Sequence, residues 1–230
     1  MTHHSNTAPV VTIDGPTASG KGTVTRQVAS ALGFHVLDSG ALYRLTAWSA
    51  LDHNVDPNDI EKVADLARRM QVRFSGQQVF LDGVDVTEPI RQEHVGNLAS
   101  RLAPQSALRE SLLDRQREFQ QPPGLVADGR DMGTIVFPDA QLKIFLTAQA
   151  PARAIRRCEQ MRQRGLNPDE QAVLLDLQKR DERDTNRSVA PLLPAEDAHQ
   201  IDSSELSIDE TVQQILSLWH ATVAQTKNIL

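Results

Sequence analysis

The sequence predicts an α/β protein in which a parallel sheet is flanked by helices, with a small antiparallel sheet and a helical lid inserted into it. Three observations support this fold class. Near-continuous apolar runs alternate with helical patterns, which favours a parallel sheet covered on both faces. A glycine-rich loop joins the first apolar run to the first helical pattern. Residues 71–88 instead alternate apolar and polar side chains around an Asp-Gly pair, which is typical of a hairpin.

The first half of the chain supplies the start of the sheet and the insertion. In chain order we expect a strand at 10–13, a helix at 25–32, a strand at 34–37, helices at 41–52 and 59–70, the small sheet at 71–88, and helices at 89–102 and 105–119. Gly33 suits the end of the first helix, because glycine adopts the left-handed conformation easily. Asp82-Gly83 predicts the hairpin turn, and Pro104 separates the last two helices.

The second half completes the sheet and adds the lid. We expect strands at 125–128, 142–146 and 199–202, and helices at 151–164, from 167 to about 184, and from 207 onward. Gly165 ends the first of these helices, and Asn167-Pro168 is expected to cap and start the next. The turn around Gly165 joins two basic helices, which suits a mobile lid. Ser207 and Glu210 have capping-box spacing.

These elements predict a disordered N-terminus at 1–8 and a single domain at 9–230. Its parts are a core (about 9–38, 124–150 and 190–230), an insert (about 39–123) and a lid (about 151–189).

The formal charge of −6 argues against a nucleic-acid-coating surface. The single cysteine, Cys158, excludes an internal disulfide and suits a reducing cytoplasm. No apolar stretch of the sequence approaches membrane-spanning length, and its patterning suggests a monomer.

The most specific motif is a phosphate-binding loop. Between the first strand and helix stands the run Gly15-Pro16-Thr17-Ala18-Ser19-Gly20-Lys21-Gly22-Thr23, in the context in which G-x-x-x-x-G-K-[ST] binds phosphates. Glycines let successive N–H groups point at an anion, and the helix start adds its positive dipole end. Lys21 would reach the β- and γ-phosphates of a nucleoside triphosphate. Thr23 would hold the Mg²⁺, because Gly22 stands where Ser or Thr is usual. The motif predicts the P-loop NTPase fold.

Two polar segments follow expected strands, at the sheet edge where ligands gather in open α/β proteins. The first, 38–44, ends in Arg44, which lies about one turn into the expected helix and would face an anion near its start. The simpler interpretation of this segment is that Asp38 or Ser39 caps that helix. The second begins with Asp128, which fits the role of holding magnesium directly or through water. Arg130 is then a candidate phosphate clamp, and a polar turn that ends the strand is the alternative.

A third charged segment spans 179–187. At 100° per residue, its candidates fall within one arc of about 100°; they are Arg180, Arg183, Asp184 and Arg187. A solvated charged face would explain this pattern equally well. However, phosphoryl transfer spreads negative charge over equatorial oxygens, and arginines are bidentate donors suited to those oxygens. We therefore interpret this arc as functional.

Together these motifs resemble the bacterial cytidylate kinases. GPTASGKGT, DSGALYR, DGRDMGTIVFPDA and RDERDTNRSVAPL occur in that family's order and spacing, and the resemblance runs from about residue 10 to the C-terminal helix. It implies that the small inserted sheet enlarges a monophosphate-binding domain. It also implies ATP with Mg²⁺ on the phosphate loop and CMP or dCMP as the acceptor.

The resemblance further implies a role for each candidate. Around the acceptor phosphate it places Ser39, Arg44, Arg130 and Arg187; on the ribose Arg180 and Asp184; and on the cytosine ring Ser100, Arg109 and Asp131. Lys21, Arg130, Arg180, Arg183 and Arg187 are the implied catalytic group. Arg156 and Arg157 are implied lid residues, with Arg157 on the ATP side.

The cytosine assignment also has a chemical basis. Cytosine presents an amino donor at C4 and acceptors at N3 and O2. Asp131 or Ser100 can accept from the amine, and the Arg109 guanidinium can donate to N3 and O2. Uracil reverses the groups at C4 and N3, because it has an acceptor at C4 and a donor at N3. A site that hydrogen-bonds one specific edge of a base rejects the mismatched base strongly. We therefore expect CMP and dCMP to be preferred over UMP.

The mechanism follows from the acceptor. The second phosphate pKa of a nucleoside monophosphate is near ~6, so its attacking oxygen is ionised at neutral pH and needs no general base. Rival interpretations are another nucleotide kinase, for example for UMP, and a P-loop kinase of a small alcohol, which needs an acid to take the hydroxyl proton. A GTPase-type switch or binding module is the non-enzyme alternative, but the sequence has no guanine-reading N-K-x-D.

Overall fold

The computed structural model describes residues 8–76 and 78–227. The chain forms two compact units: Met1–Leu37 with Phe119–Leu230, called the core unit below, and Asp38–Glu118, called the insert unit. Residues 1–7 of the predicted disordered segment lie outside the described residues. Ala8 is described, and its carbonyl oxygen accepts a hydrogen bond of 2.7 Å from Nε2 of Gln120.

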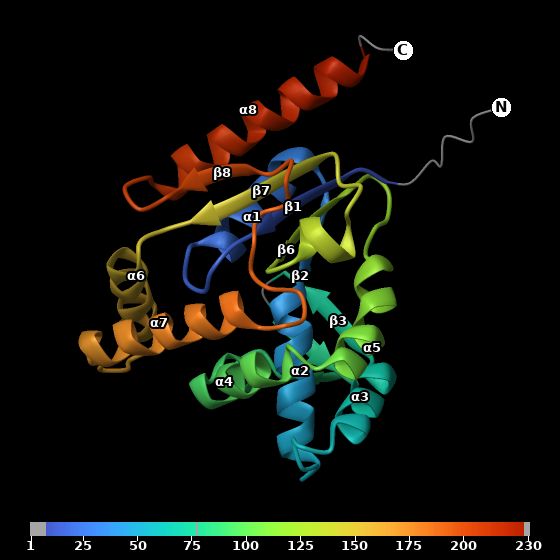
Figure 1. The fold of residues 1–230 in the computed structure, drawn as a ribbon, viewed down its shortest axis with the longest axis vertical. Helices are drawn as coiled ribbons and strands as arrows, with labels where there is room; N and C mark the ends of the chain where they lie inside the picture. Colours follow the sequence, from blue (N-terminus) through green and yellow to red (C-terminus); the bar gives the residue numbers. More distant parts are fainter. Residues whose placement is uncertain (1–7, 77, 228–230) are drawn as a thin grey trace, which may run out of the picture. The chain divides into compact units, whose positions relative to one another are not determined.

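The core unit is built on a five-stranded sheet in the order β2-β6-β1-β7-β8 (Figure 1). Its strands are β1 (Val10–Asp14), β2 (His35–Asp38), β6 (Leu125–Gly129), β7 (Leu142–Thr147) and β8 (His199–Asp202). β1 pairs in parallel with β6 and β7, and β7 pairs in parallel with β8. The predicted parallel sheet is therefore confirmed, with β1 at its centre.

One face of this sheet is covered by α1 (Lys21–Leu32) and α8 (Ile208–Lys227). Ile13 of β1, Val28 of α1 and Ile215 of α8 belong to one cluster of fully buried side chains. Each such aliphatic side chain contributes about 1.5–3 kcal/mol by leaving water. Phe34 and Trp219 add an edge-to-face contact with ring centroids 5.6 Å apart. On the other face lies a π-helical turn, η2 (Met132–Val136), which the sequence did not predict.

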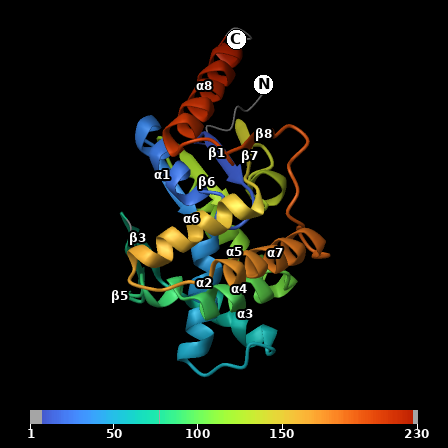
Figure 2. The same ribbon diagram turned by 90° about the vertical axis from the view of Figure 1, so that its left-hand side faces the viewer.

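Two further helices of the core unit, α6 (Ala150–Gln163) and α7 (Glu170–Asn186), pack against each other (Figure 2). The prediction that Asn167-Pro168 caps and starts the second of them is wrong. The cap is Asp169, whose carboxylate accepts from the N–H groups of Gln171 (2.9 Å) and Ala172 (3.3 Å), so the helix begins two residues later. The Asp169 carboxylate thereby satisfies two of the free N–H groups of the first turn.

The capping box at the last helix is confirmed. Oγ of Ser207 accepts from the N–H of Glu210 at 3.2 Å, and the N–H of Ser207 donates to Oε2 of Glu210 at 2.8 Å. Cys158 of α6 is a free and fully buried thiol. None of the helices in the described ranges is long and apolar enough to cross a membrane.

The insert unit combines helices with the small antiparallel sheet. Its helices are α2 (Ser39–Asp52), α3 (Ile60–Arg69), α4 (Glu93–Leu102) and α5 (Ser106–Arg117), with a 3₁₀ turn, η1 (Pro89–Arg91). Its strands are β3 (Val72–Ser75), β4 (Gln78–Leu81) and β5 (Val84–Asp85), paired in that order. Asp82 and Gly83 both have positive φ, 49° and 85°, as a type I′ hairpin turn requires. The predicted hairpin is therefore confirmed.

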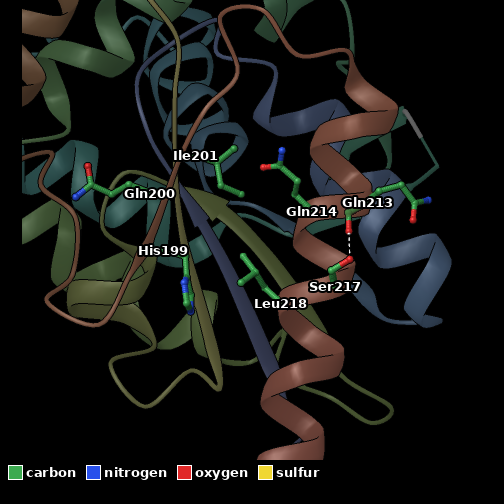
Figure 3. A pocket seen from close by; sticks show the side chains of 7 residues that line it. All are labelled: His199, Gln200, Ile201, Gln213, Gln214, Ser217 and Leu218. Carbon is green, nitrogen blue, oxygen red and sulfur yellow. Dashed lines mark hydrogen bonds between the residues drawn. The ribbon is translucent and has the colours of Figure 1, made fainter.

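A groove of about 590 Å³ lies between β8 and α8 (Figure 3). It is lined by His199, Gln200, Ile201, Gln213, Gln214, Ser217 and Leu218. The hydroxyl of Ser217 is already used, because it donates to the carbonyl oxygen of Gln213 at 2.8 Å. None of the residues predicted to carry chemistry lines this groove.

Candidate functional site

The predicted phosphate loop runs from the end of β1 to the start of α1. Gly15 allows β7 to approach closely, because a Cβ atom there would lie 2.0 Å from the carbonyl oxygen of Leu146. Gly20 caps α1 with φ of 91°, a conformation that costs other residues free energy. Ala18 also has a positive φ, 62°, although it is not glycine. The loop is therefore tightly turned and packed against the sheet.

Lys21 is the first residue of α1 and its side chain is buried. Its Nζ folds back over the loop and donates to the carbonyl oxygen of Pro16 at 2.7 Å. Burial and the neighbouring Arg130 charge lower the pKa of Lys21 to about 7, against the opposing influence of Asp128, Asp14 and Asp184. A bound polyanion would raise this pKa again by favouring the ammonium form.

Asp128 lies at the carboxyl end of β6, as predicted, and is buried. A Cβ atom on Gly22 would lie 3.4 Å from its Oδ2, so the carboxylate reaches the first turn of α1, where Thr23 follows. Carboxylate and hydroxyl oxygens are the ligands that Mg²⁺ accepts, usually together with substrate phosphates and water. These residues therefore fit the magnesium that the loop motif implies.

Arg130 connects the β6 end to α7 and to the phosphate loop. Its Nε donates to Oδ2 of Asp184 at 2.9 Å, and its Nη2 donates to the hydroxyl of Thr17 at 2.5 Å. Burial opposes ionisation of Asp184, but the charge and hydrogen bond of Arg130 outweigh it and hold the pKa of this carboxyl below its usual value. Arg180 and Arg187 act in the same direction on Asp184.

The predicted arc on α7 is partly turned into the protein. Arg180 and Asp184 are buried, and Asp184 is the partner of Arg130. The Nε of Arg187, which caps the helix end, donates to the carbonyl oxygen of Ala190. Arg183 is half-exposed and donates from Nε to the carbonyl oxygen of Lys179 on its own helix. The structure thus brings the phosphate loop, Asp128, Arg130 and the buried side of α7 into one charged cluster.

Two residues of this cluster were missed by the sequence analysis. Arg153 of α6 is buried and donates to the carbonyl oxygen of Thr17 at 3.1 Å and to Oδ1 of Asp181 on α7 at 3.0 Å. Asp14, at the end of β1, accepts from the N–H groups of Met132 and Gly133, at 2.8 Å each. The available signal for Asp14 was an acid inside an apolar strand; for Arg153 no local signal exists.

The predicted lid residues on α6 occupy different positions. Arg156 donates from Nη1 to the hydroxyl of Ser203 at 3.3 Å and from Nη2 to its carbonyl oxygen. It therefore fastens α6 to the turn after β8. Arg157 follows on the same helix and is half-buried.

The remaining predicted acceptor residues lie in the insert unit. Ser39 is buried at the start of α2 and donates to Oε1 of Gln116 at 2.8 Å. Arg44 donates to the carbonyl oxygen of Ile90 at 2.9 Å. Asp38 caps α2 by accepting from the N–H of Ala41, as one interpretation of this segment expected.

The two insert-unit residues predicted to read the base differ in their bonding. Arg109 of α5 donates at 3.3 Å both to the hydroxyl of Tyr43 and to the carbonyl oxygen of Ala103. The hydroxyl of Ser100 on α4 is buried without a hydrogen-bond partner among the described residues. A buried hydroxyl of this kind is what a polar ligand would satisfy. Asp131, the third predicted base-reading residue, is buried in the core unit.

Comparison with known proteins gives a consistent result. The family model described as Cytidylate kinase matches residues 11–221. A cytidylate kinase of Bordetella bronchiseptica is 58% identical over 214 residues, which cover 93% of this chain and 96% of the relative. Those of Ralstonia pickettii and Burkholderia thailandensis are 54% and 52% identical over 215 and 217 residues, covering 94% of this chain and 93% and 95% of the relatives.

Proposed function

Because the chain belongs to the cytidylate kinase family, we propose that it transfers the γ-phosphate of ATP to CMP or dCMP by in-line displacement, without a general base. The observation that supports the residue assignment best is the charged cluster of the core unit. It joins Lys21 of the phosphate loop, Asp128 and Arg130 after β6, and Asp184 of α7. Two polyanions must be held in line for this reaction, and fixed cationic groups are what such a transfer requires.

On the ATP side, residues 15–23 hold the triphosphate, Lys21 contacts the β- and γ-phosphates, and Arg157 contributes from α6. Thr23 and Asp128 hold Mg²⁺ together with the nucleotide phosphates, directly or through water. When bound, Mg²⁺ neutralises charge on the β- and γ-phosphate oxygens. Burial of Lys21 and Asp128 supports this assignment, because such groups interact strongly with charge in a site that excludes water.

On the acceptor side, the phosphate of CMP is held by Ser39, Arg44, Arg130 and Arg187, and its ribose by Arg180 and Asp184. The Nη2 of Arg130, which donates to the Thr17 hydroxyl, would exchange that neutral acceptor for a phosphate oxygen and so gain a charge-assisted bond. Arg180, Arg183 and Arg187 add positive charge where negative charge spreads over the oxygens of the transferring group. The attacking phosphate oxygen is already ionised near neutral pH, so no residue has to remove a proton.

Base selection falls to Ser100, Arg109 and Asp131. The unpartnered hydroxyl of Ser100 and the Asp131 carboxylate accept from the C4 amine, and Arg109 donates to N3 and O2. UMP would place its O4 against a carboxylate and its N3–H against a guanidinium. UMP is disfavoured because it leaves these buried groups mispaired. Such discrimination in kcat/KM reaches 10⁴–10⁵ at strongly hydrogen-bonded sites, and we expect at least about 10²-fold here.

A screen of nucleoside monophosphates with ATP and Mg²⁺ tests the proposal. ADP release is followed in a coupled assay, and the nucleotide products are identified by chromatography. We expect CDP and dCDP to form far faster than UDP. Equal rates with UMP and CMP would overturn the assignment of the base site, and absence of CDP would overturn the function.

We also propose a cytoplasmic monomer. The chain's one cysteine is a buried free thiol, which suits a reducing compartment. Its exposed large apolar residues, among them Leu51, Val84 and Leu193, are separated along the chain, and isolated apolar residues on a surface are ordinary. Light scattering of the purified protein should give a mass near the chain mass of 25.4 kDa. A stable mass twice as large would contradict the monomer.

A further inference from the structure

Asp14 has a position that none of the proposed roles uses. It is the last residue of β1 and directly precedes the phosphate loop, and its side chain is 5% exposed. The other four residues of the strand are fully buried and uncharged, with exposures of 0–1%. A carboxylate at this point is unexpected for packing alone, because buried acids destabilise a fold unless they are well paired.

Both oxygens of the Asp14 carboxylate accept hydrogen bonds from the start of η2. Oδ1 accepts from the N–H of Met132 at 2.8 Å, and Oδ2 accepts from the N–H of Gly133 at 2.8 Å. Both donors are successive backbone groups at the start of η2. Each bond joins residues more than 110 positions apart in the chain, so the contact ties two distant segments together.

The segment that Asp14 holds carries two proposed substrate residues. In the β1–β6 ladder, the backbone of Asp14 is the register partner of Gly129. Its side chain then binds the chain again at Met132 and Gly133. Arg130 and Asp131 are the only residues between these two attachments. Asp14 therefore fixes both ends of the turn from which they project.

Packing leaves this turn little freedom to settle elsewhere. A Cβ atom on Gly129 would lie 2.7 Å from Cγ of Met132, and one on Gly133 would lie 2.9 Å from the hydroxyl of Thr12. Met132 itself is fully buried. The turn thus lies directly on β1, and the Asp14 carboxylate fixes the position of this turn along that strand.

The charge on Asp14 argues against a purely structural role. Burial raises its pKa to about 6, although the two amide bonds act to lower it. The ionised form therefore lowers the stability of the fold at neutral pH. A neutral side chain would suit stability better, whereas only a carboxylate accepts two N–H groups at once with full strength.

We propose that Asp14 is a positioning residue, which holds Arg130 and Asp131 in register with the phosphate loop and so aligns the acceptor nucleotide with the γ-phosphate. This inference rests on the roles proposed above for Arg130 and Asp131. Asp14 itself touches neither substrate in this scheme. It acts through the turn that it fastens to β1.

The test compares Asp14→Asn with the matched control Thr12→Val. Asparagine keeps the shape but turns an N–H₂ group toward one of the two backbone donors. Thr12 lies two residues earlier on the same face of β1, and its hydroxyl has no hydrogen-bond partner among the described residues, so valine removes no such bond. We expect Asp14→Asn to lower kcat/KM for CMP about 10–100-fold, the range seen when a supporting residue is lost. The KM for ATP should stay within about twofold, and Thr12→Val should behave like the wild type.

Two measurements separate this inference from the proposed function. If Arg130→Ala is inactive while Asp14→Asn matches Thr12→Val, the role of Asp14 is overturned and the function stands. If Arg130→Ala is fully active, the proposed role of Arg130 fails, and the inference drawn from it fails with it. An equal loss of affinity for ATP and CMP in Asp14→Asn would indicate general damage and overturn the specific role.

Hydrogen exchange of the wild type tests the attachment even if Asp14→Asn does not fold. The amides of Met132 and Gly133 should exchange as slowly as those of β6, and rapid exchange would overturn the attachment.

Discussion

Replacing Lys21 by methionine should lower turnover by orders of magnitude and at the same time stabilise the protein. Turnover should fall because methionine has no ammonium group to contact the β- and γ-phosphates. Stability should move the other way, because burial and the Arg130 charge lower the pKa of Lys21 from 10.5 to about 7. The folded state therefore disfavours the ammonium form that the unfolded chain holds at neutral pH.

The size of the stabilisation follows from this shift. With 1.36 kcal/mol per pKa unit, the penalty reaches up to about 4 kcal/mol at pH 7. Methionine loses the bond from Nζ to the carbonyl oxygen of Pro16, which offsets about 1–2 kcal/mol. A net gain of about 2 kcal/mol remains, which is roughly 4–8 °C in Tm for a chain of this size.

The pH dependence isolates the contribution of the charge. Between pH 7 and 10.5 the unfolded chain binds more protons at this site than the folded one, so wild-type stability rises with pH and the penalty fades. The advantage of Lys21→Met should therefore shrink by about 2 kcal/mol from pH 7 to pH 9. Urea unfolding of the wild type and of Lys21→Met at both pH values measures this change in the stability difference. Lys62→Met is the control, since Lys62 is an exposed partner of Asp59. An advantage that is equal at the two pH values would refute the reasoning, as would a variant less stable than the wild type at pH 7.

Three further predictions follow from the site and the loop. Arg130→Ala should lower turnover about 10²–10³-fold, as expected for loss of a transition-state donor, and should also lower the Tm, because the buried Asp184 loses its ion-pair partner; turnover within threefold at a temperature where the variant is folded would remove this arginine from the mechanism. Asp131→Asn should narrow the ratio of kcat/KM for CMP over UMP by about tenfold or more, and an unchanged ratio would exclude Asp131 from base selection. Ala18→Gly should stabilise by about 1 kcal/mol, seen as a higher urea midpoint, because φ is 62° at this residue; a lower midpoint would contradict this.

Local sequence signals predicted the parts of the fold that depend on local chemistry. Asp82-Gly83 predicted the hairpin because few other pairs adopt two positive φ values. Ser207 and Glu210 predicted a helix start because each side chain bonds the other's backbone. The start of α7 was misplaced because two neighbouring capping signals compete there, and Asp169 prevails over Asn167-Pro168. The expected helix at 89–102 is interrupted at Gln92, whose ψ of 146° is extended, and no local signal marks that break.

The site was predictable to the extent that it follows strand ends and helical periodicity. The arc on α7 grouped Arg180 with Asp184, and the structure buries both. It did not distinguish them from Arg183, which is half-exposed. Contacts between distant segments leave no such pattern. Arg153 meets Thr17 across 136 residues, and the sequence holds no trace of that contact beyond an arginine on a helix.

The sole thiol of the chain makes local opening of α6 measurable. Cys158 is inaccessible in the folded helix, so a thiol-specific reagent in solution can modify it only when α6 opens or unfolds. The modification rate at low reagent concentration therefore reports the free energy of that local opening. No second cysteine contributes to the signal, and an engineered surface cysteine would give a separate, faster phase. The protein thus carries its own probe of helix opening without any removal of native residues.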